Sequence, residues 1–280
     1  SQAVRSQMSE TLADFADLAH APLGPSAAEG WANCADYVNA NRGLPNYDTF
    51  ASAEGTFAHH ISDMCLTLGL NAADFIGFTM KIGDWTFKWE EDDAWLLQRG
   101  IDHANDMPGE FYGEHKVDIS PFTQPGQFGT LDRAWIDGDT IVIVDLKFGR
   151  GFPVSPINNK QLMLYALGFW HKFRHTHKIT RFILGIDQPR HPGGGGTWEV
   201  TLDELEEFAN WIHERAQLTL DPNATRTATA AGCQWCRRRR APGGCDEFDR
   251  FMFEILGFTP EGLDLAIMMD SGLDLPRNLD

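Results

Sequence analysis

The segment from residue 127 to 148 constrains the fold more than any other part of this sequence. Residues 140–148 form a run rich in β-branched side chains, and an Asp137-Gly138 turn separates it from residues 127–136. Two such segments around a short turn predict a β-hairpin. Residues 111–119 alternate between apolar and polar side chains, which is typical of a third strand. The sequence therefore predicts three neighbouring antiparallel strands.

Apolar side chains at helical spacing flank these strands on both sides. The expected helices cover residues 26–41, 49–68, 159–172 and 202–218, and further strands are expected at residues 179–186 and 198–201. Residues 71–108 have poor periodicity and predict only one short strand and one helix. The expected fold is α/β, with a mixed central sheet flanked by helices. Its parts are an N-terminal arm over residues 1–25, a main domain over 26–245 and an acidic helical tail over 246–280.

The composition limits the classes of protein to which the chain can belong. Hydrophobic residues make up 42% and charged residues 22%, enough to build a sizeable core. The 40 acidic and 23 basic residues give a net charge of −17, which argues against loose, charge-driven binding to nucleic acid or anionic membranes. It does not exclude a local basic groove. No apolar run approaches the roughly 18 residues of a membrane span, and residues 1–10 lack the features of a signal peptide. We expect a soluble, cytoplasmic protein with no membrane partner.

Charged side chains end the buried run of the hairpin. Asp145 and Lys147 share one face of a strand because side chains alternate, and Asp132 ends the preceding strand, so the three groups can converge. Two carboxylates can hold Mg²⁺ or Mn²⁺, which activates a water, while a lysine orients that water or offsets developing charge. An isolated Asp-x-Lys pair is usually a solvated surface pair, but at the end of a buried run its charges need partners. The set predicts phosphodiester hydrolysis.

Two helices supply further candidate residues. Gln161 and Tyr165 lie one turn apart on the helix after the hairpin, where an amide and a phenol can touch a phosphate or the lysine. His59 lies on an early helix, and a neutral imidazole is a common metal ligand. Taken alone, Tyr165 would be a core residue and His59 an ordinary polar position.

In combination, these motifs resemble a known nuclease superfamily. His59, Gly129-Thr-Leu-Asp132, Asp145-Leu-Lys147 and Gln161-x-x-x-Tyr165, in that order, are similar to the RecB-like branch of the PD-(D/E)XK nucleases. Within that branch a family of phage and prophage proteins is more similar still, through Ala53-Glu-Gly-Thr-Phe-Ala-His59, Val144-Asp-Leu-Lys-Phe-Gly-Arg-Gly151, Asn159-Lys-Gln-Leu-Met-Leu-Tyr-Ala-Leu-Gly168 and Gln188-Pro-Arg190.

The resemblance covers about residues 26–245 and implies a restriction-endonuclease-like core. It implies that His59, Asp132, Asp145 and the carbonyl of Leu146 bind the catalytic metal, that Lys147 is the catalytic lysine, and that Gln161 and Tyr165 support it. Glu114, on the neighbouring strand, either adds a carboxylate near the metal or is a surface cross-strand charge. The implied activity is that of a DNA exonuclease acting on linear ends, with phage recombination proteins as partners.

Three cysteines lie close together near the C-terminus. Cys233, Cys236 and Cys245 form a C-x2-C-x8-C pattern, and three thiolates so placed can bind one metal centre. Helicase-associated and CRISPR-adaptation relatives of the nuclease branch look similar, with one early and three late cysteines around a [4Fe-4S] cluster. This resemblance implies Cys34 as the fourth ligand, although Ala35 replaces the proline often found there. Structural Zn²⁺ on the same thiolates is the alternative. Cys65 is left over.

Four arginines follow the second cysteine of this pattern directly. Guanidinium groups suit phosphate recognition, so we expect a contact with the DNA backbone from Arg237, Arg238, Arg239 and Arg240. The alternative is a solvated basic run that offsets the acidic tail.

Two functions compete with cleavage. The first is a catalytically silent protein that binds DNA ends or recruits a partner on the same fold. The second is a zinc-stabilised interaction protein whose acidic surface recruits basic partners.

Overall fold

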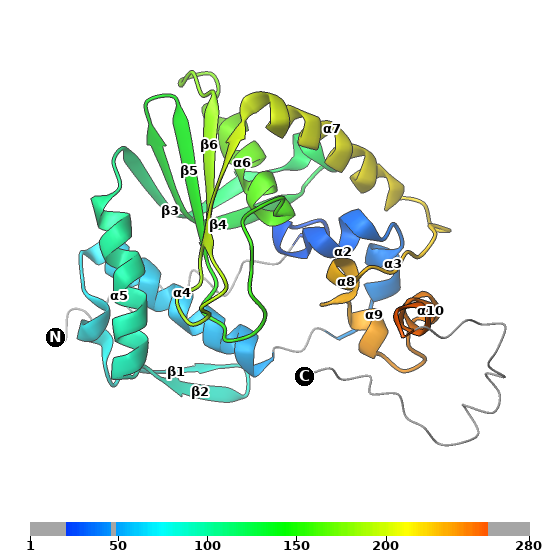
Figure 1. The fold of residues 1–280 in the computed structure, drawn as a ribbon, viewed down its shortest axis with the longest axis horizontal. Helices are drawn as coiled ribbons and strands as arrows, with labels where there is room; N and C mark the ends of the chain where they lie inside the picture. Colours follow the sequence, from blue (N-terminus) through cyan, green and yellow to red (C-terminus); the bar gives the residue numbers. More distant parts are fainter. Residues whose placement is uncertain (1–20, 46–48, 257–280) are drawn as a thin grey trace.

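A computed structural model describes residues 21–45 and 49–256, and its centre is a five-stranded sheet flanked by helices (Figure 1). The strand order is β3 (Glu110–Asp118), β4 (Phe128–Asp137), β5 (Thr140–Leu146), β6 (Arg181–Asp187) and β7 (Gly196–Thr201). The β5–β6 pair is parallel and the other neighbours are antiparallel. This confirms an α/β fold with a mixed central sheet and the three predicted antiparallel strands. Most of the predicted arm and tail, residues 1–20 and 257–280, lies outside the described residues.

Apolar side chains cover both faces of the sheet. A parallel strand pair needs a crossover, and α6 (Lys160–Phe173) supplies it between β5 and β6. Ile141 and Ile143 of β5 pack with α6 in one core, together with residues of α7 (Leu202–Leu218). Val142, between them, packs instead with Ala104 on the opposite face. The alternation of side chains along β5 therefore serves two cores.

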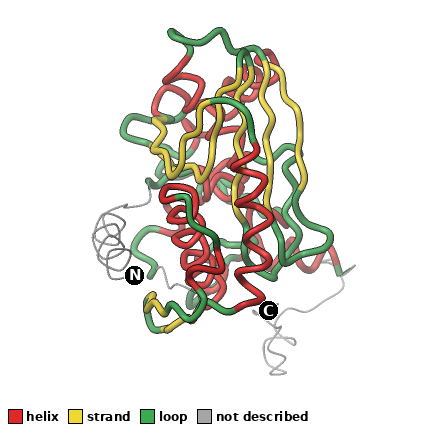
Figure 2. The backbone as a smooth tube through the Cα atoms, turned by 90° about the vertical axis from the view of Figure 1, so that its left-hand side faces the viewer, coloured by secondary structure: helices red, strands yellow, loops and turns green. Residues whose placement is uncertain are grey.

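The second core lies under α4 (Phe50–Leu68) and α5 (Glu91–Asp106). Both helices contribute buried side chains, such as Phe57 and Leu97, which pack with Leu146 from the end of β5. A small hairpin of β1 (Thr79–Ile82) and β2 (Trp85–Lys88) closes this end of the molecule, away from the large sheet (Figures 1 and 2). The helices expected over residues 49–68, 159–172 and 202–218 are thus present as α4, α6 and α7.

Two predictions about local structure were wrong. The helix expected over residues 26–41 is broken into η1 (Pro25–Ala27), α2 (Ala28–Asn33) and α3 (Tyr37–Asn41). The backbone is extended at Cys34, which separates the last two, and Tyr37 folds back against Gly30, where no side chain stands in its way. Residues 71–108 hold two strands, because a Gly83-Asp84 turn joins β1 to β2, in addition to η2 (Ala72–Phe75) and α5. Gly83 has a φ of 57°, which favours glycine.

The C-terminal segment returns to the N-terminal helices. It contains α8 (Ala230–Cys233), α9 (Arg237–Arg240) and α10 (Asp246–Ile255). In Figure 1, α8 and α9 lie beside α2 and α3, and both pairs of helices are in contact. Among the described helices, none is both long enough and apolar enough to cross a membrane.

Two buried arginines connect the sheet to α4 and α5. Arg133 of β4, whose side chain is 3% exposed, pairs with Asp187 at 3.1 Å and donates to the Ser62 hydroxyl at 2.9 Å. Arg190 follows β6, pairs with Glu54 at 2.8 Å and with Asp93, and stacks on Phe148. Losing one partner of a buried pair is costly because the other charge stays in the protein. These arginines therefore fasten both helices to the sheet.

A substitution at Arg190 tests this arrangement. We expect Arg190→Met to lower the free energy of unfolding by about 3 kcal/mol, because two carboxylates lose their cation. The matched control is Arg181→Met, since Arg181 pairs with Glu199 on the exposed surface. That change should cost less than about 1 kcal/mol. Urea denaturation measures both values, and similar losses would contradict the role given to Arg190.

Gly100 on α5 provides a second test. A Cβ atom at this position would clash with the Asp187 carboxylate, which Arg133 holds in place. Gly100→Ala should therefore lower the free energy of unfolding by about 1–3 kcal/mol, although alanine is the better helix former. On α4, a Cβ at Gly55 would meet no neighbouring atom within 4 Å. Gly55→Ala should therefore raise the free energy of unfolding by up to about 1 kcal/mol. Thermal or urea denaturation that gave both changes the same sign would refute the proposed crowding.

Candidate metal centre and active site

The sheet ladder is interrupted where the predicted carboxylates lie. The β3–β4 register pairs Gly113 with Arg133 and His115 with Leu131, but it omits the pair between them, Glu114 and Asp132. The β4–β5 ladder likewise ends one position before Asp132 would face Asp145. Instead, the Asp132 carboxylate accepts a hydrogen bond from the backbone N–H of Leu146 at 2.7 Å. Regular pairing is therefore interrupted at these residues, and the Asp132 side chain makes contacts outside the ladder.

The backbone at Glu114 explains why its side chain faces α4. Glu114 has a φ of 39°, in the left-handed region that non-glycine residues rarely adopt. As a result Tyr112 and His115, three positions apart, both contact Phe169 of α6. Regular alternation would have placed these two side chains on opposite faces. The deviation turns Glu114 to the other face, and rare conformations of this kind often mark functional sites.

His59, Glu114 and Asp132 come together from three elements. One ligand atom from each lies within 4.8 Å of the others, and Nδ1 of His59 is 3.3 Å from Oδ1 of Asp132. In the described ranges, this is the group of three or more such side chains that is close enough to hold one ion. An imidazole and two carboxylates suit Mn²⁺ and, through the oxygen atoms, Mg²⁺. The secondary candidate Glu114 thus lies with the predicted ligands His59 and Asp132.

Burial and mutual charge alter the pKa values of this group. Burial opposes the imidazolium form of His59, but the Asp132 carboxylate outweighs it and raises the pKa of His59 to about 9. Burial and the charge of Asp132 raise the pKa of Glu114 to about 8. Burial works against ionised Asp132, yet His59 and Lys147 lower its pKa. The group therefore holds protons at neutral pH that a metal ion would displace.

Asp145, Lys147, Gln161 and Tyr165 form a connected network on the α6 side. Lys147 Nζ lies 2.7 Å from Oδ2 of Asp145 and donates to the Gln161 side-chain carbonyl at 3.1 Å. Asp145 is buried, with 2% of the residue exposed. The Gln161 amide lies 3.0 Å from Oδ1 of Asp145 and 3.1 Å from the Tyr165 hydroxyl. Asn159 caps α6 by accepting from the N–H of Leu162, so the first turn that carries Gln161 is anchored. The structure thus brings these four side chains together.

Charge compensation sets the protonation of Lys147. Burial lowers the pKa of its ammonium, but Asp145 and Asp132 outweigh this and raise it. Burial also raises the pKa of Asp145, against the effect of Lys147. Lys147 is therefore a cation and a hydrogen-bond donor at neutral pH. Leu146, whose carbonyl was implied as a ligand, lies between the two charged residues with its side chain in the α4 core.

Cys34 lies close enough to the three late cysteines to interact with them electrostatically, although the sequence separates it widely from them. Burial raises the pKa of the Cys233 thiol, and the charges of Cys236, Cys245 and Cys34 raise it further. Gly232 brings α8 against α2, since a Cβ there would lie 3.0 Å from the side chain of Asn33. In the described part of the chain, no three of these sulfur atoms lie within 4.8 Å of one another. Cys65 is buried separately in the α4 core.

Sequence reasoning missed one residue beside these thiols. Asn41 is 3% exposed, and its amide donates to the sulfur of Cys236 at 3.5 Å. Its carbonyl accepts from the backbone N–H of Arg238 at 3.0 Å. An asparagine near the end of an expected helix is too common to single out from sequence.

The four arginines are not a uniformly solvated run. Arg237, Arg238 and Arg239 are half-buried and Arg240 is exposed. Arg237 donates to the backbone carbonyl of Leu44 at 2.8 Å, and Arg239 stacks on Phe248. Part of the run therefore joins the C-terminal segment to α3 and α10.

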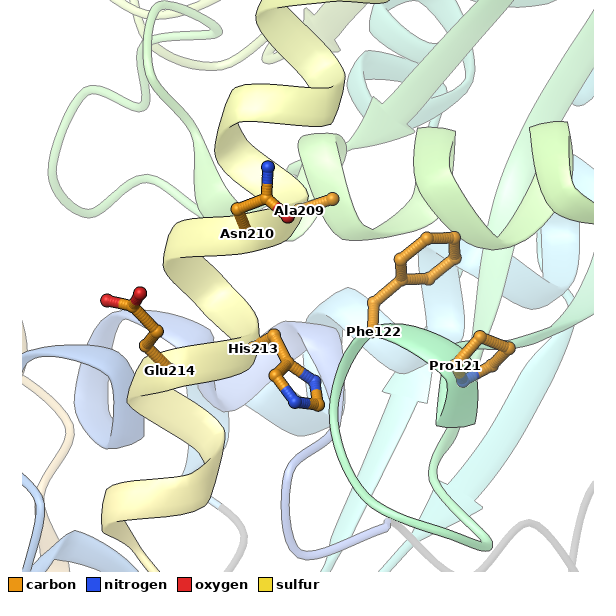
Figure 3. A pocket seen from close by; sticks show the side chains of 6 residues that line it. All are labelled: Pro121, Phe122, Ala209, Asn210, His213 and Glu214. Carbon is orange, nitrogen blue, oxygen red and sulfur yellow. The ribbon is translucent and has the colours of Figure 1, made fainter.

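A shallow hollow of about 540 Å³ lies between η3 (Ser120–Phe122) and α7 (Figure 3). Its lining is formed by Pro121, Phe122, Ala209, Asn210, His213 and Glu214. None of the sequence-predicted site residues lines it.

Two comparisons relate the chain to known proteins. The solved structure titled "Crystal structure of SSO0001" is 12% identical, with a TM-score of 0.36, over 86% of this chain and 95% of that chain. A family described as "Protein of unknown function (DUF2800)" matches residues 20–254. Because this match spans most of the sequence, the chain belongs to that family.

Proposed function

We propose that the protein is a metal-dependent nuclease that hydrolyses phosphodiester bonds in DNA, as an exonuclease at linear ends, on a restriction-endonuclease-like core. One observation carries the proposal: His59, Glu114 and Asp132 gather metal-ligand atoms directly beside the Asp145–Lys147–Gln161 network. Phosphodiester hydrolysis needs a cation on the phosphate and a donor for the charge that develops. The cytoplasmic setting and phage recombination partners belong to the same proposal.

The donor set fits Mg²⁺ or Mn²⁺. His59, Glu114 and Asp132 would hold the ion, with Asp145 and the carbonyl of Leu146 on the side toward Lys147. When bound, the ion polarises the phosphate and lowers the pKa of a water molecule. Ligation requires His59 and Glu114 to give up the protons that their raised pKa values retain. The left-handed backbone at Glu114 keeps its carboxylate beside His59 and Asp132, where it would ligate the ion.

Lys147 and its neighbours act on the phosphate. Hydrolysis adds a water oxygen to phosphorus and breaks the bond to the leaving sugar oxygen, which gains a proton. Since its pKa is raised, Lys147 serves as a charged donor and not as a general base. Gln161 holds this ammonium against Asp145, and the Tyr165 hydroxyl holds Gln161. The network thus orients the lysine before substrate binds.

We propose a [4Fe-4S] cluster on Cys34, Cys233, Cys236 and Cys245, with structural Zn²⁺ as the alternative. Adjacent sulfurs around one tetrahedral zinc lie about 3.8 Å apart, given a Zn–S bond of about 2.3 Å. No three of these sulfurs lie that close together in the described ranges, and the support for an iron–sulfur centre is the pattern of one early and three late cysteines. Such a centre would join Cys34, between α2 and α3, to the C-terminal segment.

Replacing Lys147 tests the catalytic proposal. We expect Lys147→Ala to reduce Mn²⁺-dependent cleavage of end-labelled linear DNA by at least about 100-fold, because the charged donor is lost. Lys160→Ala is the control, since Lys160 pairs with Glu29 outside the network. Mn²⁺ binding, followed by electron paramagnetic resonance, separates lost chemistry from lost metal. Wild-type protein that binds DNA ends but cuts no substrate would favour the silent end-binding alternative.

A change at Glu114 tests the ligand set. Glu114→Gln should weaken Mn²⁺ binding at least about tenfold, since one carboxylate ligand is removed. Glu110 lies on the same strand, but its side chain is exposed, so Glu110→Gln should leave Mn²⁺ affinity unchanged. Isothermal titration of both variants measures the difference. Unchanged affinity in Glu114→Gln would remove Glu114 from the ligand set.

Metal analysis tests the cysteine centre. Protein purified without oxygen should be brown, absorb near 400 nm (roughly) and contain iron, whereas a zinc protein is colourless. Cys236→Ser should lose this absorbance and melt at a lower temperature, because the centre joins distant segments. Cys65→Ala should keep the iron, since Cys65 is buried in the α4 core away from the other four. Iron retained at wild-type level in Cys236→Ser would exclude that ligand.

A further inference from the structure

An exposed tryptophan lies next to the four arginines. Trp235, between Cys233 and Cys236, is 62% exposed, although tryptophan usually buries most of its surface. The guanidinium of Arg240 lies 6.0 Å from the centre of its ring, within range of a cation–π contact. Trp235 lies between α8 and α9, and Arg240 ends α9, which contacts α3 away from the large sheet (Figure 1). We call Trp235 and Arg237–Arg240 the Trp235 patch.

The arginines of the Trp235 patch form no ion pair with any described residue. Across residues 21–45 and 49–256, none of its four guanidinium groups lies within 4.0 Å of a carboxylate, although the chain has 40 acidic residues. The Nε atoms of Arg238 and Arg239 are buried without a hydrogen-bond partner among the described residues. Burial and the positive charge of Arg240 lower the pKa of Arg239. The patch therefore concentrates positive charge that an anion can relieve.

We propose that the Trp235 patch binds single-stranded DNA, with an unpaired base stacked on Trp235 and the backbone phosphates on the arginines. Proteins that hold single strands combine these two elements, because each base has an aromatic face and each nucleotide a phosphate. A duplex keeps its bases stacked inside, so it can use the arginines but not the indole. The combination of an exposed indole with guanidinium groups that have no carboxylate partner among the described residues therefore favours a single strand.

This inference deepens the proposed function and rests on it for its biological meaning. The patch contains no residue of the catalytic network, so it would hold the substrate strand at a second point outside the active site. It also offers a route by which a chain with a net charge of −17 binds DNA, since stacking does not depend on overall charge.

The chain contains a matched control for Trp235. Trp95 on α5 is 66% exposed, and Arg99 lies 6.0 Å from the centre of its ring, as Arg240 does from Trp235. However, Trp95 follows the acidic residues Glu91, Asp92 and Asp93 in the first turns of α5. Trp95 therefore has an exposed ring with one nearby guanidinium group, as Trp235 does, but it lacks the cluster of positive charges.

The experiment measures the affinity of the full chain for a fluorescent 20-nucleotide single strand by anisotropy, without added divalent metal. Trp235→Ala should weaken binding about tenfold, within the range measured for one stacked base, and Trp235→Phe should restore most of it. Trp95→Ala should bind like wild type. Arg240→Gln should reduce the salt slope by about 0.7, the value for one phosphate contact on a single strand. Affinity for blunt duplex should not change in Trp235→Ala.

Metal content and melting temperature reveal whether Trp235→Ala disturbs the neighbouring cysteines. If it does, a second experiment that needs no variant tests the inference. Wild-type protein is then compared on normal and fully abasic strands, and the abasic strand should bind at least about tenfold more weakly. Equal affinity of the wild type for both strands overturns the inference. So does wild-type single-strand affinity in both Trp235→Ala and Arg240→Gln, as expected for Trp95→Ala. If wild type cuts DNA in that case, the proposed function still stands. If it cuts no DNA while Trp235 governs single-strand binding, the proposed function fails and the patch remains.

Discussion

Compensation of buried negative charge is the constraint on which the arrangement of this protein depends. The side chains of Asp132 and Asp145 are 13% and 3% exposed, at the end of the hairpin that forms the middle of the sheet. A buried carboxylate without a partner is strongly unfavourable. His59 from α4 contacts Asp132, and Lys147, directly after β5, contacts Asp145. Helix α4 is therefore held over the sheet partly by the same contact that builds the site.

The pairing has a consequence for the metal-free and metal-bound states. In the absence of metal, the proton on His59 supplies the positive charge that Asp132 needs, as its raised pKa records. A divalent cation between His59, Glu114 and Asp132 would supply that charge in its place. In the metal-free structure, Lys147 has its own carboxylate partner, Asp145. Under the proposed function, metal binding would therefore be coupled to proton release from His59 and Glu114.

Regular periodicity explains which parts of the site could be predicted from sequence. Asp145 and Lys147 follow strand alternation, and Gln161 and Tyr165 follow helical spacing, so their convergence was expected and is present. The approach of Glu114 to His59 and Asp132 depends on a backbone with a φ of 39°, and no residue pattern encodes that turn. Sequence reasoning therefore placed Glu114 only as a secondary candidate.

The misplaced elements have equally local causes. The sequence of residues 26–41 contains no signal for the helix break at Cys34, because this break depends on the packing of Tyr37 against Gly30. That packing is tertiary, whereas helical spacing reports only the periodicity of the segment. In residues 71–108 the turn signal, Gly83-Asp84, is present in the sequence, but its two strands have only four residues each. Strands that short give too few alternations to stand out from their surroundings.

The charge of the chain makes the position of its few basic groups decisive. At physiological ionic strength, a charge is screened beyond about 8 Å, so the net charge of −17 repels a distant phosphate only weakly. Closer than that distance, the groups that face the ligand determine the sign of the interaction. Lys147 is held by Asp145, whereas the arginines of the Trp235 patch have no carboxylate within 4.0 Å in the described chain. We therefore expect local attraction for a phosphate at the patch, whereas at the proposed catalytic site it would depend on a bound metal.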